Sequence, residues 1–252
     1  MNLADLAWPA VATLSKDLPV VIPVAALEQH GHHLPVFTDS MLLGEIVGRV
    51  AHRFETRALF LPLMWLGNSS HHLDFAGTLT AAPRVYLDLL GGLAENLLTD
   101  GFRRIVFING HGGNDVPGRQ AIFELRQRHR ERDDVLFLFA TYWSLGARPW
   151  ETDTCLLQRE MGHACEWETS MMLRLAPHLV GDFKSAAPIE SGSLFAPAAR
   201  GWITRERTQP GHIGQPHVAT AEKGETLFRL FADDFAALLE RVSSWDGHSW
   251  HG

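Results

Sequence analysis

VVIPVAALEQHGHHLPVFTDS, residues 20–40, is an apolar run that gives way within a few positions to a cluster of carboxylates and imidazoles. Residues 20–26 predict a buried strand. Glu28 and His30 are two positions apart, so they would project to one side as that strand ends. Asp39 lies within Thr-Asp-Ser, which is typical of a helix N-cap, so the next helix would begin there. Because carboxylate and neutral imidazole together suit zinc, manganese or ferrous iron, this stretch predicts a metal site.

Short apolar runs alternate with helical patterns along the rest of the chain. Strands are predicted at 58–63, 104–108 and 135–140. Helices are predicted at 40–54, at 83–98, after 114 through 122 and 125 to about 130, at 162–175 and at about 219–242. This alternation is typical of βαβ units, which form a parallel sheet covered on both faces. Since no linker or repeat divides the chain, we expect a single α/β domain over residues 1–252. Ligands of such sheets bind at the carboxyl ends of the strands.

The composition argues against several classes of protein. The formal charge of −7 and the lack of a Lys/Arg cluster argue against a nucleic-acid partner. No apolar run is long enough to span a membrane, and the first residues lack the pattern of a signal peptide. Cys155 and Cys165 have no CxxC spacing, which indicates a reducing compartment and no thiolate metal cage. We therefore expect a cytoplasmic protein that binds a small-molecule substrate, no nucleic acid and no membrane.

A second motif, NGHGGN at residues 109–114, follows the predicted strand at 104–108. Its glycines let the backbone approach other groups closely, and His111 would be presented just beyond the strand end. Alone, the motif is equally typical of an ordinary strand-to-helix turn with Asn114 as the N-cap. Beside the first motif, it favours His111 as a further metal ligand.

A third motif, HACEWETS at residues 163–170, places two carboxylates in an otherwise apolar predicted helix. A lone buried charge is costly there, so a metal or a proton-transfer role would explain it. On a regular helix His163 and Glu168 diverge by about 140°, so both face one site only if His163 lies at a frayed first turn. We expect Glu168 to point inward and Glu166 to be solvated or hydrogen-bonded.

The three motifs together resemble the creatininase (creatinine amidohydrolase) family. The resemblance continues through a loop at 67–78 and a segment at 211–216, and so spans residues 20 to about 224. It implies a three-layer α/β sandwich with a mainly parallel central sheet. It also implies two divalent metal ions of zinc or manganese type, with ferrous iron as another ion that this ligand mix suits. The family is homo-oligomeric, commonly hexameric, so we expect a homo-oligomer.

The resemblance also implies a set of ligands. By position, Glu28, His30, Asp39 and His111 match the metal ligands of the family, with Asp39 as the bridge between two ions. Creatininase itself has a glutamate ligand two residues after the histidine of the second motif, where this chain has Gly113. We therefore expect the remaining ligand from Glu168, and this departure argues against creatinine itself as the substrate.

The predicted chemistry is hydrolysis by a water whose pKa the metal ions lower. His163 or Glu168 would carry its proton to the leaving nitrogen. We expect His33 to support the ligand shell through its second ring nitrogen, as metal-site partners commonly do.

Three further side chains keep two interpretations each. His72 would face the site from its loop or lie on the surface. Trp143 and Trp150 would either wall a flat substrate or pack in the core or an interface.

The predicted activity is therefore metal-dependent hydrolysis of a cyclic amide, a formamide or another non-peptide C–N bond. One alternative uses the same ions for ring-opening hydrolysis or isomerisation of a cyclic keto-sugar or keto-inositol. Another is a non-catalytic metal-dependent binding protein, which is disfavoured because every ligand of the first motif is present. The substrate itself depends on loops 65–80, 142–160 and 184–215, whose shape no periodicity determines.

Overall fold

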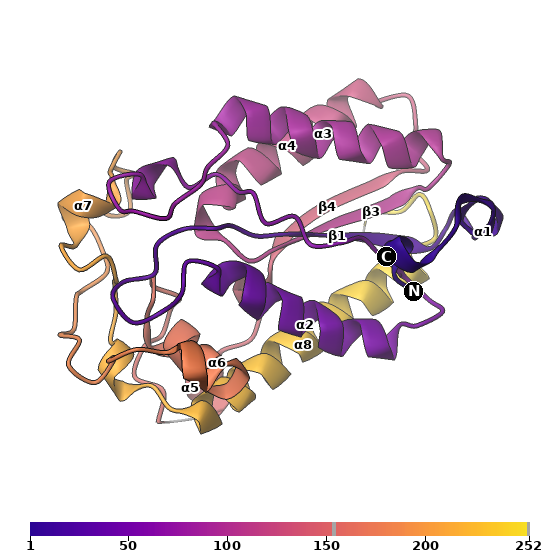
Figure 1. Cartoon of the computed structure of the whole chain (residues 1–252). Coiled ribbons are helices and arrows are strands. Elements are labelled where there is room, and N and C mark those ends of the chain that lie inside the picture. The colour runs from indigo at the N-terminus through magenta and orange to yellow at the C-terminus, as the bar shows by residue number, and fades with distance from the viewer. Residues whose placement is uncertain (153–154, 251–252) are drawn as a thin grey trace.

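The computed structural model describes residues 1–152 and 155–250, and its centre is a parallel four-stranded sheet between two layers of helices (Figure 1). The strands are β1 (Pro19–Val24), β2 (Leu59–Phe60), β3 (Arg104–Asn109) and β4 (Leu136–Thr141). They lie in the order β2-β1-β3-β4, and every neighbouring pair is parallel. The predicted α/β sandwich with a parallel central sheet is confirmed.

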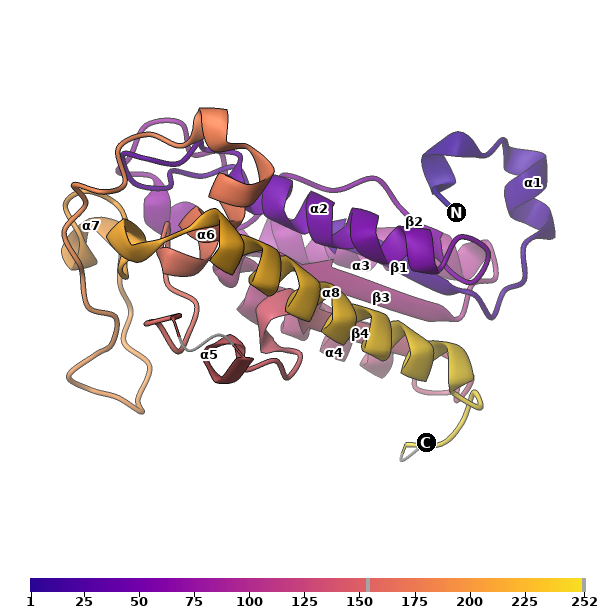
Figure 2. The same cartoon turned by 90° about the horizontal axis from the view of Figure 1, so that it is seen from below.

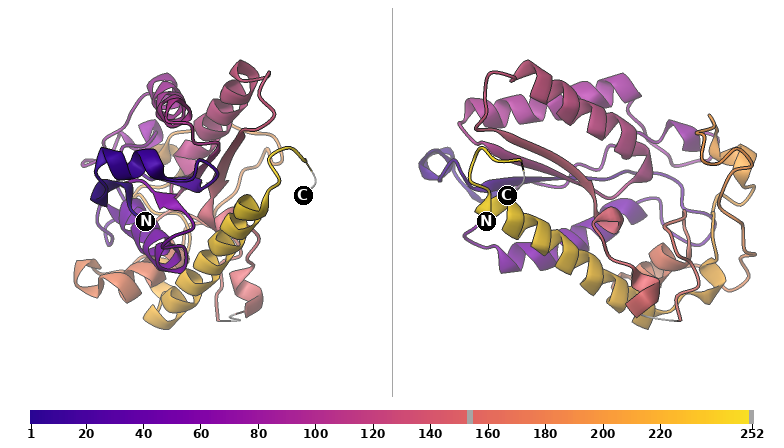
Figure 3. Two further views of the ribbon diagram at one scale, coloured as in Figure 1. Left: turned by 90° about the vertical axis from the view of Figure 1, so that its right-hand side faces the viewer. Right: turned by 180° about the vertical axis from the view of Figure 1, so that it is seen from behind.

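The helices are segregated onto the two faces of the sheet. α3 (Pro83–Thr99) and α4 (Asp115–Arg128) cover one face. α2 (Thr38–Arg53), α6 (Glu166–Leu175) and α8 (Ala221–Ser244) cover the other, where α2 and α8 run side by side (Figure 2). The view from behind in Figure 3 shows the same three layers.

The sequence of β1 explains why both faces are covered. Val20, Ile22 and Val24 pack into the core beneath α3 and α4, whereas Val21 packs into the core beneath α2 and α8. Side chains alternate across a strand, so a strand that is apolar at every position must be buried on both sides.

Short helices lie in the connections between these elements. They are η1 (Leu3–Asp5), α1 (Trp8–Thr13), η2 (Ser70–His72), η3 (Gly112–Asn114), η4 (Tyr142–Ser144), α5 (Pro149–Thr152), η5 (Pro177–Leu179), α7 (Thr204–Arg207) and η6 (Pro216–Val218). The long loops and α7 gather beyond the carboxyl ends of the strands, at the end of the molecule opposite both termini (Figure 1). In the part of the chain that the structure describes, no helix is long and apolar enough to cross a bilayer.

Several predicted element boundaries are wrong. The first strand ends at Val24, so Glu28 and His30 lie in the loop beyond it, and only Leu59–Phe60 of the run at 58–63 joins the sheet. α2 has Phe37 as its N-cap, without a side-chain cap, so Asp39 lies inside the first turn. The predicted helix at 162–175 begins only at Glu166.

Candidate metal centre

The residues predicted as metal ligands meet in one buried cluster at the carboxyl end of the sheet. Glu28 and His30 come from the loop after β1, Asp39 from the first turn of α2, His111 from the turn after β3, and Glu168 from the first turn of α6. All five are nearly inaccessible to solvent. Parallel strands place their carboxyl ends at one edge, which is why segments so far apart in sequence converge.

Asp39 connects the two halves of this cluster. Its Oδ1 lies 3.0 Å from Nε2 of His30, and its Oδ2 lies 3.0 Å from Nδ1 of His111. Oε1 of Glu28 lies 3.3 Å from the same His111 nitrogen, and Oε1 of Glu168 lies 3.7 Å from the same His30 nitrogen. The arrangement is two groups of three donors that share one carboxylate.

The donor set fits a pair of divalent cations. Among the described residues, Oε2 of Glu28 and Oε2 of Glu168 are buried and have no hydrogen-bond partner. Burying carboxylate oxygens without partners is costly, and a bound cation would remove that cost. Nitrogen and carboxylate donors together suit zinc and manganese.

The pKa values of His111 and Glu168 are both raised, for different reasons. Burial alone would lower the pKa of His111, but Glu28 and Asp39 outweigh it and raise that pKa to about 10. Burial raises the pKa of the Glu168 carboxyl, which the contact with His30 only partly offsets. Without cations, the cluster therefore holds protons at neutral pH that bound cations would displace.

The turn carrying His111 is clamped by the two asparagines of its motif. Asn109 accepts the backbone N–H of His111 at 3.0 Å and donates to its carbonyl at 2.7 Å. Asn114 accepts from the backbone N–H of Asn68 at 2.8 Å and donates to the carbonyl of Ala25 at 3.0 Å. Asn114 therefore ties the turn to its neighbouring loops and makes no side-chain cap on α4.

No side chain fits at Gly113, the position where creatininase itself has a glutamate. A Cβ there would overlap the backbone carbonyl of Asn68 and the ring of His111. Besides Asp39, the carboxylate near His30 is Glu168, which points inward as predicted.

His163 and Glu168 both face the cluster because the chain turns sharply between them. Backbone hydrogen bonds join His163 to Ile213, and Ala164 has a φ of 46°, the only positive φ at a non-glycine residue among the residues described. Nδ1 of His163 lies 3.6 Å from Oε1 of Glu28. A non-glycine residue in this conformation is strained, and such strain is concentrated at functional sites.

The hydrogen bonds of His163 determine which of its nitrogens is basic. Nε2–H donates to the backbone carbonyl of Gln29 at 2.7 Å, so Nδ1 carries the lone pair and faces the cluster. Burial, reinforced by the neighbouring His30 and His72, lowers the pKa of His163 well below its usual value. The ring is therefore a neutral base at physiological pH.

His72 lies at the site rather than on the surface. Its Nε2 lies 3.3 Å from Oε1 of Glu28, and its Nδ1 lies 2.8 Å from the side-chain nitrogen of Gln29 and 3.0 Å from Oγ1 of Thr204. Burial lowers the pKa of His72 to about 3. The ring stays neutral and holds Glu28 from outside the cluster.

Two contributors were not recognised in the sequence. Gln29 sits between the first two ligands, where no pattern separated it from an ordinary polar residue, yet its amide contacts both His72 and His163. His71 has its ring centroid 5.9 Å from that of His111. The histidine-rich loop at 67–78 was a family landmark, and this was the signal that could have identified His71.

The structure gives His33 and Glu166 specific partners. Nε2 of His33 bonds Oγ1 of Thr169 at 3.0 Å, so it supports the residue that follows Glu168. Of the two environments expected for Glu166, the structure shows the hydrogen-bonded one: the side chain is fully buried and accepts from Nζ of Lys223 at 2.6 Å.

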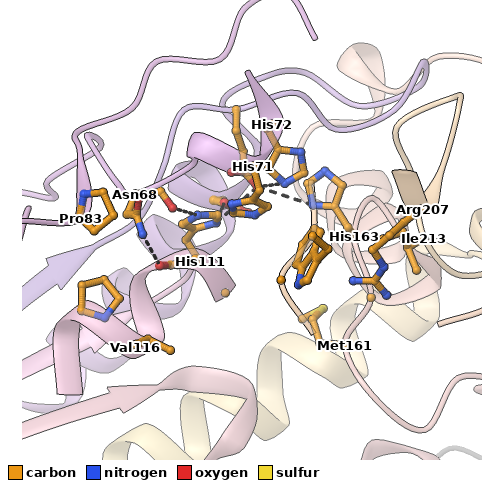
Figure 4. Close-up of a pocket in the computed structure, with 18 of the residues that line it drawn as sticks. Asn68, His71, His72, Pro83, His111, Val116, Met161, His163, Arg207 and Ile213 are labelled. Carbon is orange, nitrogen blue, oxygen red and sulfur yellow. Dashed lines mark hydrogen bonds and ion pairs between the residues drawn. The ribbon is translucent and has the colours of Figure 1, made fainter. Parts of the chain in front are cut away.

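A cavity of about 850 Å³ opens above the cluster. Its lining includes Glu28, Asp39, His111, His163 and Glu168, together with Trp143 and Trp202. Figure 4 shows His111 and His163 among the side chains of this lining. Trp150 does not line it; its ring packs against Trp167 with centroids 6.3 Å apart. One interpretation therefore applies to each tryptophan: Trp143 lines the cavity, and Trp150 packs in the core.

Comparison with known proteins finds matches to creatininase and to related hydrolases. The family model described as "Creatininase: Creatinine amidohydrolase" matches residues 4–239. A "Mycofactocin precursor peptide peptidase" of Mycobacterium ulcerans (strain Agy99) is 30% identical over 96% of this chain and 92% of its own. A solved structure called "Creatininase Mn" has a TM-score of 0.83 at 26% identity, covering 97% of this chain and 99% of that one. A mutant creatininase described as "Zn-Zn type" has a TM-score of 0.82 at 26% identity, with 97% and 98% covered.

Proposed function

The chain belongs to the creatininase family of metal-dependent hydrolases, and from this premise we propose that it hydrolyses an amide C–N bond at a centre of two divalent cations. The observation that carries the proposal is Asp39, whose two oxygens each lie 3.0 Å from an imidazole of a different half of the cluster. A single carboxylate between two donor sets can hold a pair of cations close together, as two-metal catalysis needs.

Each cation would have its own donors. Glu28 and His111 would hold one, His30 and Glu168 the other, and Asp39 would bridge them. When bound, the cations would lower the pKa of a water between them and polarise the substrate carbonyl. Zinc and manganese are the proposed ions, because nitrogen and oxygen donors suit both and both appear in the names of similar creatininase structures.

His163 would be the proton carrier. Its Nδ1 is the unprotonated ring nitrogen and faces the cluster, so it would accept a proton from the attacking water and return it to the leaving nitrogen. General acid–base catalysis of this kind contributes typically 10²–10⁴-fold. His72 would keep Glu28 oriented by donating from Nε2.

The bond cleaved is either a cyclic amide or formamide, or a peptide amide. The first follows from the resemblance of the motifs to those of creatininase. The second is supported by the relative named a peptide peptidase and by a cavity of about 850 Å³, which admits a substrate larger than one small ring.

The test is a substrate panel assayed on protein loaded with Zn²⁺ or Mn²⁺. It contains creatinine and other lactams, N-formyl amino acids, short peptides and cyclic ketoses, and it is repeated on His163→Gln. We expect turnover of at least one amide, and a fall in kcat of about 10²-fold or more in the variant with its metal content unchanged. Turnover of ketoses without any amide would reject the proposed bond class.

A further inference from the structure

The charged residues that line the cavity are sharply divided by sign. Every acidic residue of the lining, Glu28, Asp39 and Glu168, belongs to the metal centre, whereas the lining also contains three arginines. These arginines are Arg84, Arg200 and Arg207. The protein as a whole has a formal charge of −7, so a cationic wall is not a consequence of overall composition.

Arg207 differs from Arg84 and Arg205 because it has no carboxylate partner at short range. Among the described residues, no carboxylate lies within ion-pair distance of its guanidinium, although the side chain is half-buried. Arg84 lies 3.9 Å from Glu124, and Arg205, on the same short helix as Arg207, lies 3.3 Å from Asp74. Burial lowers the pKa of Arg207 and the charge of Glu160 offsets this only in part, as for a cation partly removed from water without a close counter-charge.

A series of ring contacts connects Arg207 to His111. Its guanidinium stacks over the ring of Trp202 at 4.6 Å. Trp202 meets the ring of His71 edge-on at 4.9 Å, and His71 in turn stacks on His111 at 5.9 Å. Figure 4 shows Arg207 near Ile213, on the same side of the pocket as His163.

A hydrogen bond ties the helix of Arg207 to the same centre. Oγ1 of Thr204, at the start of α7, lies 3.0 Å from Nδ1 of His72, whose other nitrogen faces Glu28. The guanidinium therefore lies in the cavity lining and is connected to the predicted ligands through Trp202 and His71.

We propose that the substrate of this centre carries an anionic oxyacid group, a carboxylate or a phosphate, which Arg207 binds while the scissile amide lies at the metal ions. The proposal rests on the proposed function for the bond that is cleaved, and it adds the substrate class: an amide that bears an acid. The planar guanidinium matches both anions with paired hydrogen bonds, and its stacking on Trp202 restricts its orientation. Arg207 is thus a specificity-determining residue.

The test measures binding rather than turnover. Isothermal titration calorimetry on Zn²⁺-loaded protein compares N-acetylglycine, its neutral analogue N-acetylglycinamide, and the phosphate monoester of N-acetylethanolamine. Each is titrated into the natural protein, Arg207→Gln and Arg205→Gln. A carboxylate also binds zinc directly. For each protein we therefore take the ratio of the affinity for the charged probe to the affinity for the neutral analogue. Comparing this ratio between variants cancels the direct contribution of zinc.

We expect Arg207→Gln to reduce the affinity ratio of at least one charged probe about tenfold or more, as loss of a hydrogen bond to a charged group does. Arg205→Gln, the matched control on the same helix, should leave both ratios within twofold. The probe that loses more identifies carboxylate or phosphate as the group recognised. A fall of less than fivefold for both probes would overturn the proposal. If no amide is cleaved but Arg207→Gln still lowers the affinity ratio as expected, the proposed function is rejected and the role of Arg207 in binding an anion is kept.

Discussion

Nδ1 of His111 lies 3.0 Å from Oδ2 of Asp39, with both side chains buried. Burial alone would lower the pKa of His111, but Glu28 and Asp39 raise it to about 10, so the metal-free protein holds a proton there at neutral pH. An imidazole must be neutral to bind a metal. We predict that Zn²⁺ binding at pH 7.5 releases protons, visible as a binding enthalpy that depends on the ionisation enthalpy of the buffer. Equal enthalpies in phosphate-free buffers of different ionisation enthalpy would contradict the assignment of His111.

The same pKa predicts opposite pH trends for the metal-free and metal-bound protein. The pKa of His111 is raised on folding, so its stabilising contribution is complete below pH 6.5 and is lost as the pH rises through about 10. The affinity for cations rises over the same pH range, because a smaller fraction of His111 carries a proton that the cation must displace. We expect the rise in Tm on adding Zn²⁺ to be larger at pH 9 than at pH 6, measured by calorimetry. At a hundredfold excess over Kd the stabilisation is about 2.7 kcal/mol.

Metal stoichiometry tests the shared role of Asp39. Asp39→Asn removes a charge from both donor groups, so we expect it to lose both cations, whereas Glu168→Gln should lose one. Asp233→Asn, on the surface and paired with Arg53, is the control and should retain both. Elemental analysis after dialysis measures the difference. Two full equivalents of metal in Asp39→Asn would rule out the bridge.

The location of the metal centre could be predicted from the sequence, whereas the boundaries and partners of the elements that carry its residues could not all be predicted. His30 and His111 follow strands of a parallel sheet, so their convergence could be expected from the fold class alone. The start of α6 could not, because it depends on the pairing of His163 with Ile213, a contact between distant segments that periodicity does not report. The partner of Glu166 could not be predicted for the same reason, because Lys223 lies in another helix.

Gly113 and Gly112 form a matched pair for a test of packing. A Cβ at Gly113 would overlap the carbonyl of Asn68 and the ring of His111, whereas a Cβ at Gly112 would meet nothing within 4 Å. We expect Gly113→Ala to destabilise the protein by about 1–3 kcal/mol, the usual range for overpacking, and to weaken metal binding through displacement of His111. Gly112→Ala should change neither quantity appreciably. Urea unfolding and metal titration measure them, and equal effects of the two substitutions would refute the close packing at Gly113.

Lys223 and Glu166 predict a large loss of stability from a substitution that touches no ligand. Nζ of Lys223 donates to Oε1 of Glu166 at 2.6 Å in the buried layer between α6 and α8, while Oε2 of Glu166 accepts from two backbone N–H groups, those of Leu157 and Gln158. Lys223→Met would leave the carboxylate buried without its counter-charge, so we expect a loss of about 3–5 kcal/mol in urea unfolding. The exposed pair of Arg53 and Asp233 supplies the comparison: Arg53→Met should cost less than about 1 kcal/mol. Because α6 also carries Glu168, Lys223→Met should in addition weaken metal binding; equal costs for the two substitutions would mean that this ion pair does not hold α6 in place.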